Sequence, residues 1–325
     1  MNAYFDLANL RSFAKAGGHQ NFQICCNMLR HNFNIHFNFR KEDLDKEKKQ
    51  SKMAIQTLLK EMTRNRGEND SISWGEVFPA RPLSADIYST MTKEQLTSIY
   101  FLDDNNIDEM VNQGCLLFAS EGNELKVLSS LLFEGRDIPT KKYPVRDMRN
   151  WQVIKDNACP CTDIIIIDPY FFAQNEIFYE FNSYRIIELL SQYNTREIDV
   201  VIFTLKDNVI FKRIESQLKE IESLRNKLKL TFVILPESGE WKEHDRTIIT
   251  NYKMFDSDPS FTYFEGDGNN VSHGRWLNVN SLGDRDIRKM SLQCICDLQK
   301  MIDERKTGVN TIIGDKKFNF RKLKI

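Results

Sequence analysis

The sequence lacks the cysteine patterns of a disulfide-stabilised or zinc-binding protein. It has seven cysteines, an odd number, and no C-x-x-C pair. Six of them form pairs that are adjacent or one residue apart: Cys25 and Cys26, Cys159 and Cys161, Cys294 and Cys296. Such close pairs cannot easily share one tetrahedral metal ion. We therefore expect reduced thiols, no bound metal and a cytoplasmic protein.

The sequence also has no surplus of charge of one sign. It contains 45 basic and 46 acidic residues, which gives a formal charge of −1. This balance provides no general attraction to nucleic acid or to acidic membranes, so any surface that binds a polyanion must be local. No stretch approaches the roughly 20 apolar residues of a membrane helix, and no basic segment precedes an apolar run near Met1. We expect neither a membrane partner nor a signal peptide.

Glycine is scarce, with 14 copies, whereas phenylalanine is abundant, with 22. This composition favours an α/β protein over a turn-rich all-β one. The length of 325 residues suits two domains. The polar stretch TKKYPVRDMRNWQVIKDNACPC begins at residue 140 and is interpreted as a connector with two prolines. We therefore predict an N-terminal domain over residues 1–145 and a second domain over 146–325.

The first domain shows the pattern of a smaller α/β or α+β unit of unknown role. LANLRSFAKAGG predicts a helix that ends at two glycines. GCLLFASEGNELKVLSSLLFEG, over residues 114–135, predicts a strand, a turn and a helix. This domain is the candidate surface for a protein partner.

The second domain begins with the strongest strand pattern in the chain, CTDIIIIDPYFF. Four consecutive isoleucines, Ile164–Ile167, predict burial on both faces of a largely parallel sheet. A helix follows from Asn182, then the strand EIDVVIFTL, a long amphipathic helix, and the strands LTFVILPES and HDRTIITNY. This order of β-α-β-α-β-β predicts an α/β domain with right-handed crossovers.

Polar residues gather at the predicted strand ends. Asp168 and Tyr170 follow the isoleucine strand, Glu237 follows the third strand, and His244 and Arg246 open the fourth. Because α/β sheets bind ligands at the carboxyl ends of their strands, we expect these side chains to form one site.

The segments DIIIIDPYFF, DVVIFTL, LTFVILPES and EHDRTIITNY, over residues of about 160–265, together resemble the phospholipase D-like fold. The resemblance is closest to the compact C-terminal domain of MIT-domain proteins and some bacterial relatives. In active members a histidine, a lysine two residues later and an aspartate five further on form half a site. The resemblance implies that one histidine attacks phosphorus, another protonates the leaving oxygen, and the lysines neutralise the phosphate.

By position, His244 matches the family's histidine, Arg246 its lysine and Asn251 its aspartate. Arginine can hold a phosphate through two parallel hydrogen bonds, but asparagine cannot supply the negative charge of the aspartate. The same H-x-R-x4-N spacing recurs at His273, Arg275 and Asn280. A second half-site could therefore come from this chain or from another subunit.

The resemblance implies metal-independent phosphodiester hydrolysis or phosphate recognition on DNA or RNA, by a homodimer without a cofactor. His244 would be the nucleophile or acid, Arg246 the phosphate clamp and Asn251 an orienting residue, with Asp168 also in the catalytic group. Four further residues are expected to contact the substrate: Tyr170, Glu237, His273 and Arg275.

An alternative is a binding or scaffold module that kept the fold and lost the chemistry. The near-neutral charge favours it, because a general nuclease usually presents a basic face. In this interpretation His244 is a structural residue satisfied by a neighbour such as Asp168, which itself caps a helix. The basic tail DKKFNFRKLKI is either a solvated end or a phosphate contact.

The first domain resembles a second family over a short stretch. AYFDLANL is similar to the opening of the metal-dependent NYN and PIN ribonucleases, with Asp6 and Asn9 as matching residues. The later strand-and-helix element brings Ser120, Glu121 and Asn123 near the places of family aspartates. The resemblance implies a Mg²⁺ site, for which Asp6, Glu121 and Glu124 are the available carboxylates. The alternative is a module that packs against the second domain.

Overall fold

The computed structural model describes residues 1–64, 72–75, 98–102, 117–119, 121–133, 139–172, 176–192, 197–205, 211–224, 228–235, 246–304 and 311–314. The chain divides into two compact units. Unit 1 comprises Met1–Pro139 and Ser281–Arg288, and unit 2 comprises Thr140–Asn280 and Lys289–Ile325. The predicted boundary after residue 145 lies inside unit 2, and the return of the chain to unit 1 was not expected.

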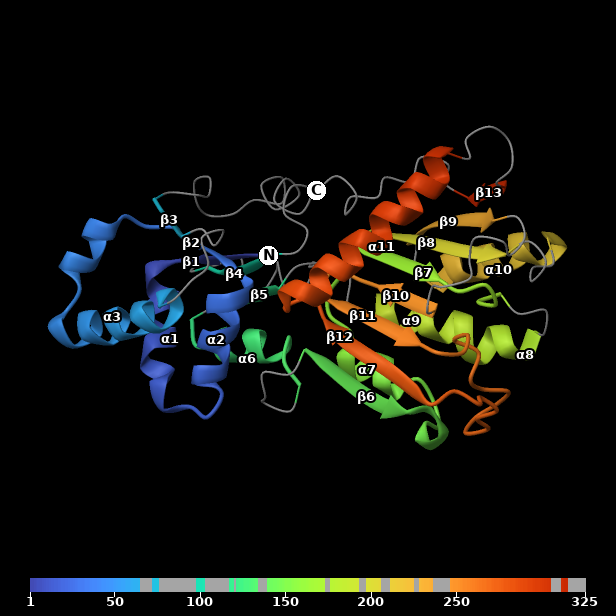
Figure 1. The fold of residues 1–325 in the computed structure, drawn as a ribbon, viewed down its shortest axis with the longest axis horizontal. Helices are drawn as coiled ribbons and strands as arrows, with labels where there is room; N and C mark the ends of the chain where they lie inside the picture. The colour runs from blue at the N-terminus through green and yellow to red at the C-terminus, as the bar shows by residue number, and fades with distance from the viewer. Residues whose placement is uncertain are drawn as a thin grey trace. The chain divides into compact units, whose positions relative to one another are not determined.

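Unit 1 contains a sheet whose described strands are all parallel, in the order β3-β2-β1-β4-β5 (Figure 1). The strands are β1 (Asn2–Phe5), β2 (Asn34–Phe37), β3 (Ile72–Trp74), β4 (Ile99–Phe101) and β5 (Leu117–Ala119). The order of connection reverses between β1 and β4. In sheets of this kind the reversal marks the place where ligands bind, next to the carboxyl end of β1.

Helices of unit 1 pack together beside this sheet (Figure 1): α1 (Leu7–Lys15), α2 (Phe22–Asn32), α3 (Lys49–Thr63) and α6 (Glu124–Ser129). Phe5 of β1 faces them, because its ring stacks on Phe13 of α1 at 6.4 Å between centroids. Alternation along the strands sends Tyr4, His36 and Tyr100 to the other face, where their rings stack at 4.6 and 5.1 Å. Unit 1 is therefore an α/β unit, as the sequence predicts.

The short returning segment, Ser281–Arg288, is tied to the carboxyl end of α2. The backbone N–H of Arg285 donates to Asn32 Oδ1 at 2.9 Å, and Arg288 Nη2 donates to the Asn32 carbonyl at 2.6 Å. Burial and the charge of Arg285 lower the pKa of Arg288 to about 10. A cationic donor at a helix carboxyl end satisfies carbonyls that have no partner within the helix.

Unit 2 contains a mixed sheet in the order β13-β9-β8-β7-β10-β11-β12-β6. Its strands are β6 (Thr140–Pro144), β7 (Asp163–Ile167), β8 (Ile198–Leu205), β9 (Leu228–Leu235), β10 (Arg246–Ile249), β11 (Lys253–Ser257), β12 (Trp276–Ser281) and β13 (Thr311–Gly314). The three strands β7, β8 and β9 are parallel, and β10 runs antiparallel to β7. The isoleucines of β7 are all buried, as their uninterrupted run predicts.

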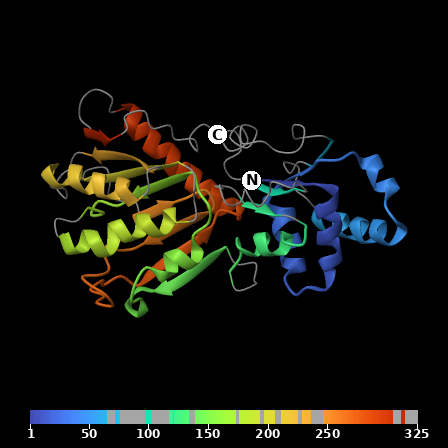
Figure 2. The same cartoon turned by 180° about the vertical axis from the view of Figure 1, so that it is seen from behind.

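Helices cover both faces of this sheet, which confirms the predicted α/β class (Figures 1 and 2). One face carries α7 (Gln152–Asn157), α9 (Arg185–Ser191) and α10 (Phe211–Leu224), and the other carries α11 (Arg285–Glu304). The short α8 (Glu176–Phe178) leads into a π-helix over Tyr179–Tyr184. No helix in the described part of the chain is long and apolar enough to cross a membrane.

The connector predicted from residue 140 onward is wrong, because these residues form β6 and α7. β6 pairs with β12 at the edge of the sheet, where exposed lysines such as Lys142 discourage pairing with other chains. Trp151 and Ile154 are buried. The residues that bury Trp151 and Ile154 are distant in the sequence. The local pattern of the segment is polar, so it did not indicate that the segment contributes to the core.

β11 and β12 form a long hairpin. Its two arms are antiparallel, because the residue pairs in contact move forward along one arm and backward along the other. Asn280 Nδ2 donates to Asp256 Oδ2 at 2.5 Å, and the backbone N–H of Val271 donates to the Tyr263 carbonyl at 2.8 Å. Between these points Gly274 packs so closely on Pro259 that a Cβ at 274 would lie 2.5 Å from the proline ring. The hairpin therefore brings the start of β12 to the sheet edge where β7 ends and β10 begins.

Candidate functional site

Asp168 and Arg246 lie opposite each other at this edge, which we name the carboxyl edge of β7. Asp168 follows β7, and the antiparallel register of β7 with β10 places Arg246 across from it. Asp168 is fully buried. Its Oδ2 accepts from Ser260 Oγ at 2.6 Å and from the Phe261 N–H at 2.7 Å, while its Oδ1 accepts from the Tyr170 N–H at 2.9 Å. Both carboxylate oxygens are therefore engaged within the protein.

Burial raises the pKa of Asp168, and the hydrogen bonds from Ser260, Tyr170 and Phe261, together with the charge of Arg246, oppose the rise. A carboxylate so enclosed fixes the turn after β7 and the loop after β11. This geometry gives Asp168 a structural role at the candidate site, which corresponds to the capping alternative considered from the sequence.

Arg246 differs from Asp168 because part of its guanidinium has no acceptor. The side chain is half-buried, and its Nε is buried without a hydrogen-bond partner among the described residues. Its charge acts on Asp168, yet the oxygens of that carboxylate accept from other donors. A buried donor left without an acceptor costs about 1–3 kcal/mol, so a native structure usually has a reason to keep one.

Asn251 lies at the other end of β7, so the expectation that it orients a substrate beside Arg246 is corrected. Its Oδ1 accepts from the backbone N–H groups of Thr162 and Asp163 at 2.9 and 3.2 Å, and its Nδ2 donates to Thr162 Oγ1 at 3.1 Å. Five strand residues span roughly 17 Å. The fully buried Asn251 therefore holds the start of β7 and does not contact the site of Arg246.

The second H-x-R pair reaches the carboxyl edge of β7 through the hairpin. His273 and Arg275 are exposed in the segment that precedes β12, and the Arg275 carbonyl accepts from the Val145 N–H at 3.2 Å. Tyr170 is 46% exposed at the same edge. His244 and Glu237, also predicted for this site, lie outside the described residues.

Two residues of this edge were missed from the sequence. Ser260 binds Asp168, and Trp276, the first residue of β12, is 42% exposed. Ser260 could not be identified, because its partner is 92 positions away. Trp276 directly follows the second H-x-R pair, and an aromatic residue next to paired cations is the signal that could have drawn attention to it.

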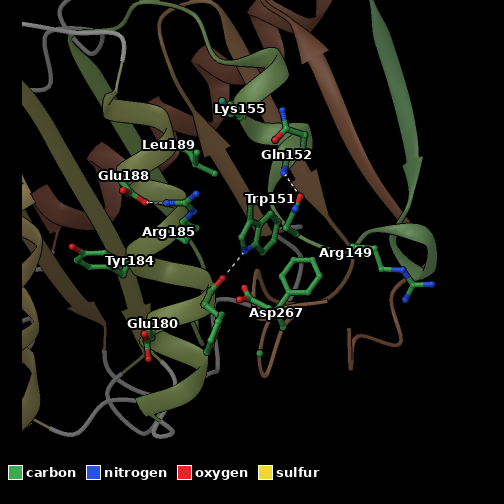
Figure 3. A pocket seen from close by; sticks show the side chains of 14 residues that line it. Arg149, Trp151, Gln152, Lys155, Glu180, Tyr184, Arg185, Glu188, Leu189 and Asp267 are labelled. Atoms are coloured by element: carbon green, nitrogen blue, oxygen red, sulfur yellow. Dashed lines mark hydrogen bonds and ion pairs between the residues drawn. The ribbon is translucent and has the colours of Figure 1, made fainter. Parts of the chain in front are cut away.

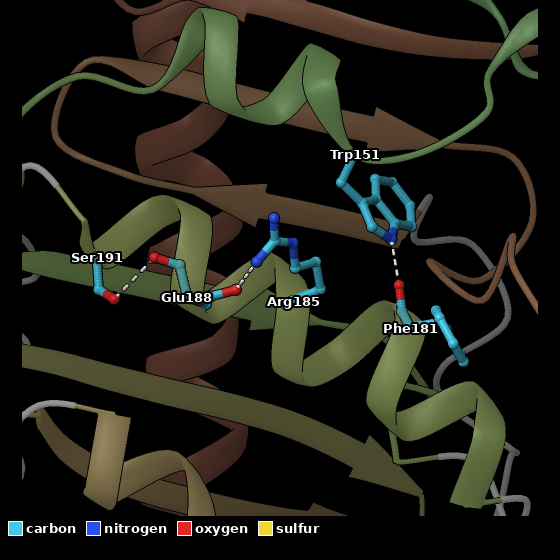
Figure 4. Close-up of polar contacts among 5 residues, drawn as sticks. All are labelled: Trp151, Phe181, Arg185, Glu188 and Ser191. Carbon is cyan, nitrogen blue, oxygen red and sulfur yellow. Dashed lines mark hydrogen bonds and ion pairs between the residues drawn. The ribbon is translucent and has the colours of Figure 1, made fainter. Parts of the chain in front are cut away.

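A separate cavity of about 380 Å³ opens on the face of the sheet covered by α7 and α9 (Figure 3). Trp151 forms its floor, and the indole Nε1 donates to the Phe181 carbonyl in the π-helix at 3.0 Å (Figure 4). Arg185 forms an ion pair with Glu188 on its wall (Figure 4). A π-helix departs from the 3.6-residue period, so this site could not be seen in the sequence pattern.

The loop between β11 and β12 connects this cavity with the carboxyl edge of β7. Ser260 and Phe261 bind Asp168, while Phe264, three residues further on, lines the cavity. Asn182 of the π-helix holds Phe264 through two hydrogen bonds, donating to its carbonyl at 2.8 Å and accepting from its N–H at 3.0 Å. The first part of the loop is thus fixed at two points, at Asp168 and at Asn182.

In unit 1, Asp6 occupies the carboxyl end of β1, where the strand order reverses. Its Oδ1 accepts from Asn38 Nδ2 at 2.9 Å. Nearby, Glu124 accepts from Asn9 Nδ2 at 3.1 Å and from Ser12 Oγ at 3.2 Å. The backbone N–H of Gly122 lies 3.1 Å from both oxygens of Glu124. Burial raises the pKa of Glu124 against the effect of these hydrogen bonds.

These residues do not fit the Mg²⁺ site that the NYN and PIN resemblance implies. Within the part of the chain that the structure describes, no three His, Cys, Asp or Glu residues lie close enough together to hold a metal ion. Both oxygens of Glu124 face protein donors, Glu121 and Asn123 are exposed, and Ser120 lies outside the described residues. We derive no metal-dependent step for unit 1.

Comparisons with known proteins add little to this geometry. No protein-family model and no curated protein matches the chain. Among solved structures, one similar chain is TrmBL2, an archaeal chromatin protein whose structure shows a novel mode of DNA binding. The similarity has a TM-score of 0.29 at 11% identity and spans 55% of this chain and 59% of that one. A TM-score this low supports neither a common fold nor a common function.

Proposed function

We propose that unit 2 recognises a phosphodiester group of nucleic acid at the carboxyl edge of β7, with Arg246 as the phosphate contact. The observation that carries the proposal is the buried Nε of Arg246, which has no acceptor among the described residues. Because the side chain as a whole is only half-buried, a phosphate that approaches the guanidinium from solvent would supply an acceptor that the described part of the protein does not. The guanidinium presents its N–H groups in a planar fork that matches two phosphate oxygens.

The surroundings of Arg246 support binding of an anion. Asp168, the carboxylate that register places across from Arg246, accepts hydrogen bonds from the loop and is fully buried, so it does not occupy the guanidinium fork. Arg275 and His273 are exposed on the hairpin segment that reaches the same edge. One chain therefore supplies two arginines, Arg246 and Arg275, at this edge.

Recognition is favoured over hydrolysis by the roles of two other residues. Asp168 is enclosed, and Asn251 holds the opposite end of β7. Neither is available to orient a catalytic histidine in the way that the phospholipase D resemblance implies. The non-catalytic alternative therefore describes this edge best, and His244 remains the residue on which a hydrolytic activity would depend.

The first test is binding of fluorescently labelled oligonucleotides, measured by anisotropy at several salt concentrations. Arg246→Gln should weaken binding and reduce the slope of log K against log salt by about one phosphate contact. Lys219→Gln is the control, because it removes one positive charge from an exposed position of α10. Equal affinity and slope in the two variants and the parent protein would refute the role of Arg246.

The second test is cleavage of the same oligonucleotides with and without EDTA. We expect no cleavage in either condition. Cleavage that persists in EDTA and is lost in His244→Ala would overturn recognition in favour of a phospholipase D-like hydrolysis. Cleavage that EDTA and Asp6→Asn both abolish would instead move the activity to unit 1. Light scattering of the bound complex would show whether one chain suffices.

A further inference from the structure

Two exposed aromatic side chains lie at the carboxyl edge of β7. Exposed large hydrophobic residues are few in the described part of the chain: Met53, Tyr170, Ile177, Trp276 and Met290. The two aromatic ones, Tyr170 and Trp276, both belong to this edge. Tyr170 follows Asp168 and donates its N–H to that carboxylate, and Trp276 opens β12 directly after Arg275. Exposed rings at the same edge as two arginines are suited to a ligand that carries both flat aromatic groups and phosphates.

The order of strands separates these rings and places Arg246 between them. Along the edge, β7 is followed by β10, β11 and β12. Tyr170 comes after β7, Arg246 begins β10, and Trp276 begins β12. With strands about 4.8 Å apart, the three steps from β7 to β12 span roughly 14 Å. Along the edge, Arg246 therefore lies between the chain positions of Tyr170 and Trp276.

We infer that this edge binds single-stranded nucleic acid, with bases stacking on Tyr170 and Trp276 while the backbone contacts Arg246 and Arg275. The inference rests on the proposed function and specifies its ligand. Exposed aromatic faces attract bases that are not already stacked within a duplex, and base–aromatic stacking tolerates any sequence. Alternating rings and cations are the arrangement that tracks a single strand.

The charges at the edge agree with this ligand. Three basic residues, Arg246, His273 and Arg275, stand at the strand ends or on the hairpin, whereas Asp258 is an exposed carboxylate next to Ser257 of β11. Asp168 is buried beneath them. Among these described residues, two arginines stand against the one exposed carboxylate of Asp258, although the whole chain has a formal charge of −1. Such a local surface is the kind that a near-neutral chain requires in order to bind a polyanion.

The test compares single-stranded and duplex oligonucleotides of one sequence, using the full chain. The parent protein should bind the single strand more tightly. Trp276→Leu should weaken that binding by about 5- to 150-fold, which corresponds to the loss of one stacked base. Tyr170→Leu should act in the same direction. Met290→Ala is the control, because Met290 is 59% exposed on α11, outside this edge.

Tryptophan fluorescence provides a second readout that does not depend on affinity. Of the four tryptophans, Trp151 is buried with 1% exposure, Trp74 belongs to unit 1 and Trp241 lies outside the described residues. The part of the quenching that disappears in Trp276→Leu is therefore the part that a base stacked on Trp276 should cause. Binding that depends on Arg246 but is equal for single strand and duplex, and unaffected in Trp276→Leu, would overturn this inference alone. Binding that does not depend on Arg246 would overturn the proposed function itself.

Discussion

Asn251→Ala should lower the stability of unit 2 but leave the affinity of the folded protein for its ligand unchanged. Asn251 is fully buried and its side-chain oxygen accepts from two backbone N–H groups, those of Thr162 and Asp163. Alanine would leave both donors buried without this acceptor. At about 1–3 kcal/mol for each, the loss is about 2–6 kcal/mol, a large part of the 5–15 kcal/mol that stabilises a typical domain.

The measurement combines urea unfolding with amide hydrogen exchange of the peptide that contains Thr162 and Asp163. We expect a lower unfolding midpoint and faster exchange at these two amides. Asn278→Ala is the matched control, because the buried Oδ1 of Asn278 has no partner among the described residues, so its removal leaves no donor unsatisfied. Its free energy of unfolding should change by less than about 1 kcal/mol.

Oligonucleotide binding at low temperature then separates a structural role from a functional one. The folded fraction of Asn251→Ala should bind with the affinity of the parent protein. Unchanged unfolding and exchange together with lost binding would refute our reasoning. That result would support the role of Asn251 as an orienting residue, which the phospholipase D resemblance implies.

Two further substitutions test buried carboxylates. Burial raises the folded-state pKa of Glu124. The protonated side chain therefore contributes stability below the unfolded pKa of about 4.5, and this contribution is lost as the pH rises through the folded-state pKa. Between pH 4.5 and 8, the urea midpoint should fall less for Glu124→Gln than for the parent protein. The exposed Glu121→Gln should follow the parent, and identical pH profiles for all three proteins would contradict this prediction. Ser260→Ala removes a hydrogen bond of 2.6 Å to Asp168 and should lower the free energy of unfolding by about 1.5–3 kcal/mol in denaturant titrations, with no change at all as the contrary result.

The elements that could be predicted from sequence are those whose pattern is set by local burial. The isoleucines of β7 form an uninterrupted apolar run because both faces of that strand are covered, and α10 shows a clear amphipathic period. The positions of apolar residues along each segment show which of its faces are buried, so both elements can be predicted from the sequence. The order β7-α9-β8-α10-β9-β10 was predictable for the same reason, whereas β6, α7 and the elements after β10 were not predicted.

The site could be predicted only in part, because its members are brought together by strand direction and by a hairpin. Asp168 and Arg246 were expected at one sheet edge and do lie there. Asn251 was expected beside them, but five residues of strand carry it to the opposite end. Ser260 and Trp276 reach the edge through the fold of the hairpin, for which a single sequence gives no distance information.

The return of the chain to unit 1 has a consequence for how the protein is made. Arg285 and Arg288 hold the carboxyl end of α2, yet they follow unit 2 in the sequence. At about 5–20 residues per second, synthesis of the roughly 140 residues between Pro139 and Ser281 takes about 7–28 s. During that time the nascent N-terminal part has emerged without its last segment. The first unit to be translated is therefore completed only after most of the second, and a fragment that stops at Pro139 would lack part of its own fold.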